Sequence, residues 1–151
     1  MEYNNPSLLI KDLNFGEVAK NKIIAGVNKL ASAVKSTLGA SGKCVIYEDA
    51  LGNPVITKDG VTVAESVVLY DPVENIGATL IKEAAKNTVK EAGDGTTTAT
   101  VLAESLLKTI NSTKFKDSAS RVLREGVYSG LDKINEYLDS VKIDVNTDTL
   151  T

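Results

Sequence analysis

The stretch Gly93-Asp94-Gly95-Thr96-Thr97-Thr98-Ala99-Thr100 predicts a tight turn that leads directly into a helix. Two glycines let the backbone bend around Asp94, and three hydroxyl side chains follow where the helix begins. The first N–H groups of a helix have no partner within it and carry partial positive charge. The turn therefore predicts a phosphate-binding site. Because Asp94 would repel bare phosphate, a divalent cation with oxygen ligands, such as magnesium, is predicted between them. The simpler alternative is an Asp-Gly turn with a threonine N-cap, although three successive threonines lower helix propensity.

The length and composition indicate one domain that lacks histidine and has a single cysteine, so several common kinds of catalytic and metal site are excluded. The chain has 151 residues, of which 42% are apolar and only 5% aromatic, which favours helices packed through aliphatic side chains. Its net charge is −3 and no basic block is present, so we expect no nucleic-acid partner. The absence of histidine excludes histidine-based zinc sites and catalytic triads, and the single Cys44 excludes an internal disulfide.

The sequence also carries no sign of membrane insertion or export. No apolar run approaches the length of a membrane span, and the N-terminal Met-Glu-Tyr-Asn-Asn-Pro lacks the basic start and apolar middle of a signal peptide. We therefore expect no membrane association and a location in the cytoplasm or an equivalent reducing compartment.

Hydrophobic periodicity predicts four helices. The first covers 17–38, and the second starts at Asp71-Pro72-Val73-Glu74 with an aspartate N-cap and runs to about residue 91. The third runs from 96 to about 110 and is expected to bury Leu102, Leu106 and Ile110. A last long helix carries one apolar stripe, in which Gly126 and Gly130 indicate close helix packing. The stripe consists of Leu123, Val127, Leu131, Ile134, Leu138 and Val141.

Two β-branched runs, 44–47 and 54–57, predict a hairpin with a longer loop between its strands, and 8–15 could hold a further short strand. A hairpin alone is marginally stable in water, so it needs another strand from this chain or from a neighbouring subunit.

Two further motifs have an ordinary and a functional interpretation. Gly39 and Gly42, after Thr37-Leu38, fit a helix C-cap and turn, or a backbone surface that approaches a ligand closely. Lys58-Asp59-Gly60 fits a solvated turn, or a lysine for a phosphate oxygen followed by an aspartate for metal or attacking water.

In this order and spacing, the three motifs resemble the N-terminal part of a group I chaperonin of the GroEL type. The similarity runs from about residue 13 to the mid-140s, and includes Ile56-Thr57-Lys58-Asp59-Gly60-Val61 and Glu74-Asn75-Ile76-Gly77-Ala78. It implies a mainly α fold, a helical bundle with a small β-hairpin edge like an incomplete chaperonin equatorial domain. The implied organisation is a tail at 1–12, the N-terminal half of the equatorial ATP-binding domain at 13–141, and a tail at 142–151 leading towards an intermediate domain.

The resemblance implies an ATP and magnesium site with assigned roles. Asp94 would hold Mg²⁺, Lys58 would lie near the phosphates, and Asp59 would act as the catalytic residue that assists hydrolysis. The implied nucleotide-binding residues are Thr37, Leu38, Gly39, Ala40, Lys58, Asp94, Gly95, Thr96, Thr97 and Thr98. The family usually has proline at Ala40, a basic residue at Ser41 and arginine at Lys43, so the loop here is looser and less positive.

The implied function is that of an ATP-dependent chaperone subunit in a homo-oligomeric ring that folds proteins in its chamber. Unfolded proteins, and a co-chaperonin lid, would engage domains that this sequence does not contain, so we expect a fragment of a longer subunit that hydrolyses ATP poorly by itself. One alternative is a ring-assembly or interaction module derived from a chaperonin that has no turnover. Another is an ordinary helical binding domain whose threonines are helix caps.

Overall fold

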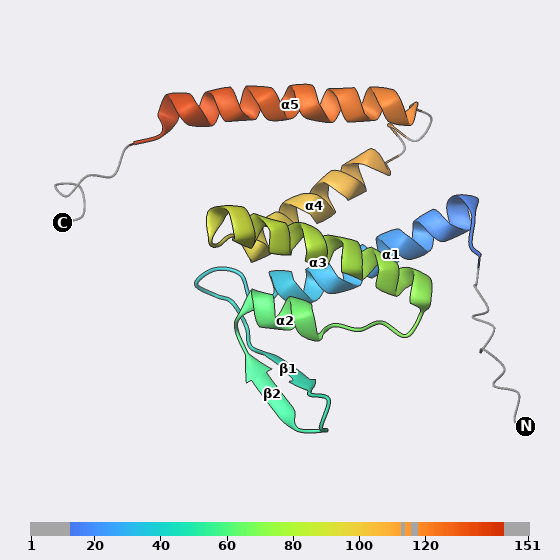
Figure 1. Cartoon of the computed structure of the whole chain (residues 1–151), viewed down its shortest axis with the longest axis vertical. Helices are drawn as coiled ribbons and strands as arrows, with labels where there is room; N and C mark the ends of the chain where they lie inside the picture. Colours follow the sequence, from blue (N-terminus) through green and yellow to red (C-terminus); the bar gives the residue numbers. More distant parts are fainter. Residues whose placement is uncertain (1–12, 113, 116–117, 144–151) are drawn as a thin grey trace, which may run out of the picture. The chain divides into compact units, whose positions relative to one another are not determined.

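The computed structural model describes residues 13–112, 114–115 and 118–143, and the chain divides into two compact units, Met1–Lys108 and Thr109–Thr151 (Figure 1). Its elements in order are α1 (Gly16–Lys35), β1 (Val45–Glu48), β2 (Pro54–Thr57), α2 (Gly60–Ser66), α3 (Pro72–Ala92), α4 (Thr96–Ile110) and α5 (Ser120–Val141). This mainly helical fold with a small two-stranded edge confirms the predicted fold class. None of the helices in the described ranges is long and apolar enough to cross a membrane.

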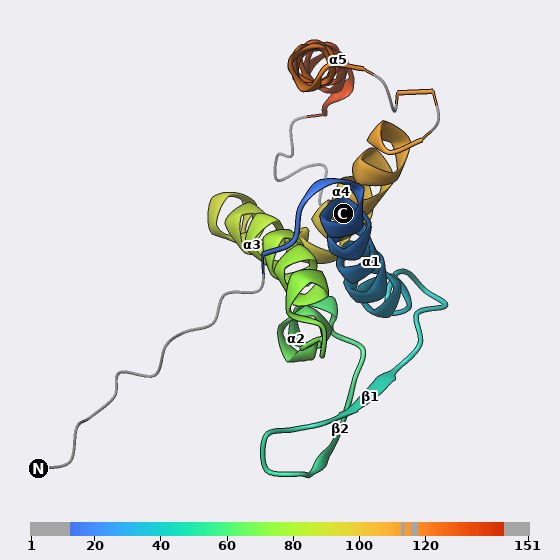
Figure 2. The same cartoon turned by 90° about the vertical axis from the view of Figure 1, so that its right-hand side faces the viewer.

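Helices α1 and α3 lie side by side because each presents a glycine to the backbone of the other (Figure 1, Figure 2). A Cβ at Gly26 would lie 1.8 Å from the carbonyl oxygen of Glu74, and a Cβ at Gly77 would lie 2.1 Å from that of Ile23. Any larger residue would push the two helices apart.

The start of α3 follows the predicted capping pattern. Asp71 Oδ1 accepts hydrogen bonds from the backbone N–H groups of Val73 at 2.8 Å and Glu74 at 3.2 Å, and Pro72 occupies the first turn. An ion pair of 2.7 Å between Lys22 Nζ and Asp71 Oδ2 connects this start to α1.

A small aliphatic core lies between α1, α2 and α3, and none of the described residues in it is aromatic. Its buried members are Val27, Leu30, Val34, Val63, Ala64, Ala78 and Ile81. The predicted extension of the first helix to Leu38 is wrong, because α1 ends at Lys35 and Leu38 is 48% exposed. The chain turns after α1. There the N–H of Thr37 donates a hydrogen bond to the carbonyl of Val34, and the N–H of Leu38 donates one to the carbonyl of Lys35.

The predicted hairpin is present, with β1 and β2 antiparallel and Ile46 paired with Ile56. Asp49 shapes its loop by accepting hydrogen bonds from the N–H groups of Leu51 and Asn53, both at 2.8 Å. Among the described residues no third strand joins this sheet. Of the strand considered at 8–15, residues 8–12 lie outside the described part, and 13–15 are not in a strand.

Helix α4 has the predicted bounds but buries a different face. Leu102 and Leu106 are 64% and 43% exposed, and Ile110 is half-buried, so the predicted burial of this stripe is wrong. The buried residues of α4 are Thr96, Thr100 and Glu104, which follow one another at intervals of four. The predicted stripe followed the apolar residues at helical spacing, whereas the buried face contains a glutamate, a residue that is rarely buried unless it is paired.

In the second unit, α5 confirms the predicted last helix. None of its residues is buried, and a Cβ built at Gly126 or Gly130 meets no atom within 4 Å, so the close packing expected at these glycines is not found within the described residues.

Candidate functional site

The turn before α4 has the predicted geometry. Gly93 and Gly95 have φ values of 79° and 101°, a region in which side chains are strained, and they flank the exposed Asp94. The carboxylate of Asp94 accepts a 2.6 Å hydrogen bond from the N–H of Gly95, which keeps it at the start of α4. The N–H groups of Thr96, Thr97 and Thr98 form the first turn of the helix, where no acceptor exists within the helix.

Thr96 supplies an unsatisfied polar atom at this helix start. Thr96 is 4% exposed, and its Oγ1 is buried and has no hydrogen-bond partner among the described residues. The neighbouring buried hydroxyl, Thr100 Oγ1, does have a partner, because it donates to the carbonyl of Thr96 at 2.9 Å. A buried hydroxyl without a partner costs free energy, and a polar ligand at the start of α4 would remove this cost.

Asp59 is the N-cap of α2, a short helix that sequence reasoning interpreted only as a turn. Its carboxylate accepts hydrogen bonds from Val61 N–H at 3.2 Å, Thr62 N–H at 3.0 Å and Thr62 Oγ1 at 2.5 Å. The Thr62 hydroxyl is the main reason that the pKa of Asp59 lies below its ordinary value, so the carboxylate is charged at neutral pH. With seven residues, α2 is too short for periodicity to reveal, although an aspartate before Gly-Val-Thr is a recognisable N-cap signal.

Gly60 is the point at which the three predicted motifs meet. A Cβ at Gly60 would lie 2.2 Å from Thr97 Oγ1 and 3.2 Å from Thr37 Oγ1. The structure therefore brings the end of α1, the start of α2 and the start of α4 together, although they are far apart in the sequence. With any other residue here, Thr97 would have to change rotamer or the backbone would have to move.

The loop after α1 is closed by its own backbone. Lys43 N–H donates to the carbonyl of Ser36 at 2.7 Å, Gly42 N–H donates to that of Gly39 at 3.0 Å, and a Cβ at Gly42 would lie 2.2 Å from the carbonyl oxygen of Thr37. Gly39 has a φ of 76° with open space around it, so both interpretations of these glycines, a turn and an exposed backbone surface, are compatible with the loop.

The remaining predicted residues are neighbours of this meeting point rather than contacts within it. Leu38, Ala40, Lys58 and Thr98 are exposed, and Lys58 forms no ion pair with any other residue in the described ranges. No group of three or more acidic or cysteine side chains that could hold a metal occurs in the described part of the chain. Asp94 alone fits magnesium that takes its other ligands from phosphate and water.

A cavity of about 320 Å³ lies beside Thr96, between α2 and α3. Lys82, Lys86 and Lys90 line it together with one acid, Glu65, whose Oε1 lies 3.3 Å from Lys86 Nζ. Burial, followed by repulsion from Lys86, lowers the pKa of Lys82. The remaining lining residues are Val61, Ala64, Ala85 and Val89.

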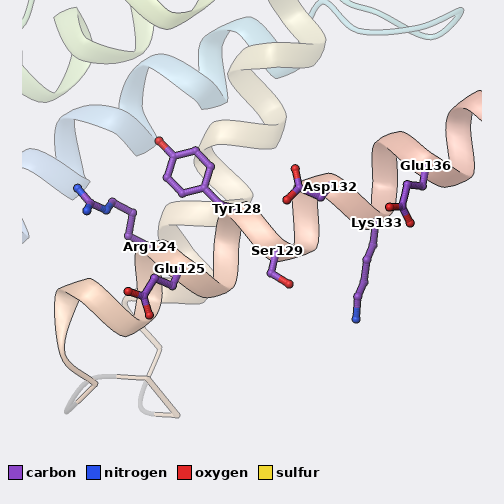
Figure 3. Close-up of a pocket in the computed structure, with 7 residues that line it drawn as sticks. All are labelled: Arg124, Glu125, Tyr128, Ser129, Asp132, Lys133 and Glu136. Carbon is purple, nitrogen blue, oxygen red and sulfur yellow. The ribbon is translucent and has the colours of Figure 1, made fainter.

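A second hollow, along α5, contains none of the predicted site residues (Figure 3). All seven residues that line it come from this one helix, and Figure 3 shows Arg124, Tyr128 and Lys133 extending away from the helix axis. One helix encloses no ligand, so we assign this hollow no role.

Sequence reasoning missed the buried Glu104, which is 2% exposed. Its Oε2 lies 2.8 Å from Lys35 Nζ and its Oε1 lies 2.6 Å from Lys108 Nζ. Burial acts to raise the pKa of Glu104, but the hydrogen bonds and charges of Lys108 and Lys35 outweigh it and hold the pKa below its ordinary value. The pair with Lys108 has helical i,i+4 spacing and was visible in the sequence, whereas the pair with Lys35 depends on the tertiary fold.

Comparison with known families agrees with this architecture. A model of the TCP-1/cpn60 chaperonin family matches residues 30–151. The match covers most of the chain and includes every predicted site residue from Thr37 to Thr98.

Proposed function

Since the chain belongs to the TCP-1/cpn60 chaperonin family, we propose that it carries the phosphate- and magnesium-binding half of the ATP site of a chaperone subunit. The observation that carries the proposal is the meeting of Thr37, Gly60 and Thr97, which joins three separate motifs at one place. The hydroxyl of Thr96, which has no partner among the described residues, adds a buried donor at the helix start, where an anion is favoured.

Each part of the site would have a distinct role. Gly95 and the first turn of α4, from Thr96 to Thr98, would bind phosphate oxygens through N–H and hydroxyl groups, and the exposed Lys58 would neutralise charge. The loop of Thr37, Leu38, Gly39 and Ala40 would form a second wall against the nucleotide. Asp94 would hold magnesium, which when bound screens the charge of the phosphates.

Asp59 is the candidate that orients water for hydrolysis. A carboxylate has about four acceptor positions, and Asp59 uses three of them in capping α2, so one remains for a water molecule. Its low pKa keeps it a charged acceptor at neutral pH. We assign it a catalytic role because a group that acts on water affects the transition state more than it affects ATP binding.

At the scale of the assembly, we propose a group I chaperonin subunit in a ring that folds client proteins. Residues 13–141 would form the N-terminal half of its equatorial ATP-binding domain, and 142–151 would lead towards an intermediate domain. A ring-assembly module without turnover is the second candidate, and the unpaired edges of the β1–β2 hairpin are the observation that favours it.

Phosphate release under steady-state conditions separates these candidates when it is measured on this chain and on a complete chaperonin subunit that carries this sequence. We expect background turnover from the chain alone, because turnover needs a closed pocket that excludes bulk water and the proposed half-site encloses only part of the nucleotide. In the complete subunit, Asp59→Asn should abolish turnover and leave ATP binding unchanged, whereas Asp94→Asn should impair both.

Asparagine is the better substitution at position 59 because it still caps α2, while Asp59→Ala also costs about 1 kcal/mol of helix stability. Full turnover by the Asp59→Asn subunit would contradict the catalytic role. Absence of turnover in the unaltered complete subunit would favour the assembly module.

A further inference from the structure

Glu104 is a buried charge outside the candidate ATP site, and both of its partners are lysines. It is 2% exposed, whereas the side chains of Lys35 and Lys108 are 49% and 53% exposed. Its carboxylate therefore sits inside the first unit while its counter-charges reach it from the surface. Such a group is stabilising only when its partners stay in place.

The two lysines hold Glu104 to different parts of the chain. Lys108 lies on α4 itself, one turn after Glu104, so its bond of 2.6 Å adds only local support. Lys35 is the last residue of α1 and lies two positions before Thr37, so its bond of 2.8 Å joins α4 to the loop that begins the other wall of the candidate site.

Glu104 also shares the buried face of α4 with Thr96, the first residue of the helix. Thr96, Thr100 and Glu104 are the buried residues of α4 and are spaced by four, so a rotation of the helix that displaced Glu104 would displace Thr96 as well. At the rise of an α-helix, eight residues place Glu104 about 12 Å along the axis from Thr96.

We propose that Glu104 is a positioning residue that, through Lys35, holds the phosphate-binding start of α4 in register with the Thr37–Ala40 loop. The expected effect on ATP binding rests on the proposed function. The positioning of α4 and the loop can be tested in the chain without any ligand. The ordinary alternative is a packing ion pair that stabilises the first unit and leaves the site unaffected.

Amide NMR of the 151-residue chain tests the proposal, because a substitution in α4 should change the chemical shifts of the Thr37–Ala40 loop, and a substitution at the end of α1 should change those of the start of α4. Glu104→Gln preserves the shape of the side chain and removes its charge, and Lys35→Met removes the other half of the bond from a half-exposed position. We expect Glu104→Gln to shift the amides of Thr37 to Gly39, and Lys35→Met to shift those of Thr96 to Thr98. Lys108→Met is the matched control, since it removes the local partner of Glu104 and should leave the Thr37 loop unperturbed.

Affinity for magnesium-ATP, measured by titration in the same spectra, gives the functional arm. Glu104→Gln and Lys35→Met should each weaken binding about fivefold, and the double variant should be no weaker than either single variant. Lys108→Met should change the affinity by no more than about twofold.

Each outcome decides a different claim. Shifts confined to the neighbourhood of each substitution, or unchanged affinity in both Glu104→Gln and Lys35→Met, would overturn the positioning role. If the unaltered chain shows no response to magnesium-ATP, the proposed function fails. The amide shifts of the variants without ATP still show whether Glu104 positions the start of α4 against the Thr37–Ala40 loop. If Glu104→Gln does not fold, Lys35→Met alone supplies both readouts.

Discussion

Gly60 is the residue at which the threonines of the first and third motifs approach the second motif most closely. The Cβ that any other residue would add lies 2.2 Å from Thr97 Oγ1, closer than real Cβ atoms come to their neighbours. The sequence could predict this glycine as part of a turn, but not the two threonines beside it, because contacts between α2, α4 and the end of α1 arise only on folding.

Gly60→Ala should therefore destabilise the chain by about 1–3 kcal/mol, since Thr97 must rotate or α2 must move. Adding Thr97→Ala should relieve the overlap and restore much of the stability, but not ATP binding, because the hydroxyl is then lost. Urea unfolding of the two variants and of Thr97→Ala provides the double-mutant cycle. A Gly60→Ala chain as stable as the parent would show that Thr97 rotates away from the added Cβ at no cost.

At the scale of the elements, the strongest local signals predicted the structure best. The Asp71-Pro72 start of α3, the Asp49 loop of the hairpin and the left-handed Gly93 at the end of α3 are all determined by bonds between near neighbours. Which face of α4 is buried could not be predicted in the same way, because the burial of Glu104 depends on Lys35, 69 residues away in the sequence.

The glycines of α5 give a prediction at this scale. With no atom within 4 Å of a Cβ at Gly126, Gly126→Ala should stabilise the helix by about 1 kcal/mol through propensity alone. The same substitution at Gly93, where φ is 79°, should destabilise the chain by about 1 kcal/mol or more and serves as the contrast. Circular dichroism during urea unfolding measures both. Destabilisation by Gly126→Ala would mean that another surface packs against this face of α5.

For the whole molecule, the hairpin predicts association. Its two strands leave edges unpaired among the described residues, and the cross-strand pair Ile46 and Ile56 is 68% and 65% exposed. We expect the chain to self-associate through this hairpin, and the double variant Ile46→Thr/Ile56→Thr, which keeps β propensity, to associate less. Sedimentation velocity over a range of concentrations checks this. A parent chain that stays monomeric at high concentration would contradict it.

The sequence predicted the separate motifs of the candidate site, but not the tertiary contacts that bring them together. The motifs around Thr37, Lys58 and Asp94 could be read as phosphate-binding chemistry, and their common family is now established. The buried hydroxyl of Thr96 and the bond from Glu104 to Lys35 are tertiary features that no local pattern encodes.

The most direct test of the central claim, that this chain binds the phosphates of ATP through a metal at Asp94, is a calorimetric titration with ATP. It should be run with magnesium and again with excess chelator, on the parent chain and on Asp94→Asn. We expect weak binding that requires magnesium in the parent, because a bare carboxylate repels a triphosphate, and loss of that binding in the variant. Equal affinity with and without chelator would contradict the metal bridge, and the absence of any heat of binding in the magnesium titration of the parent would contradict the site itself.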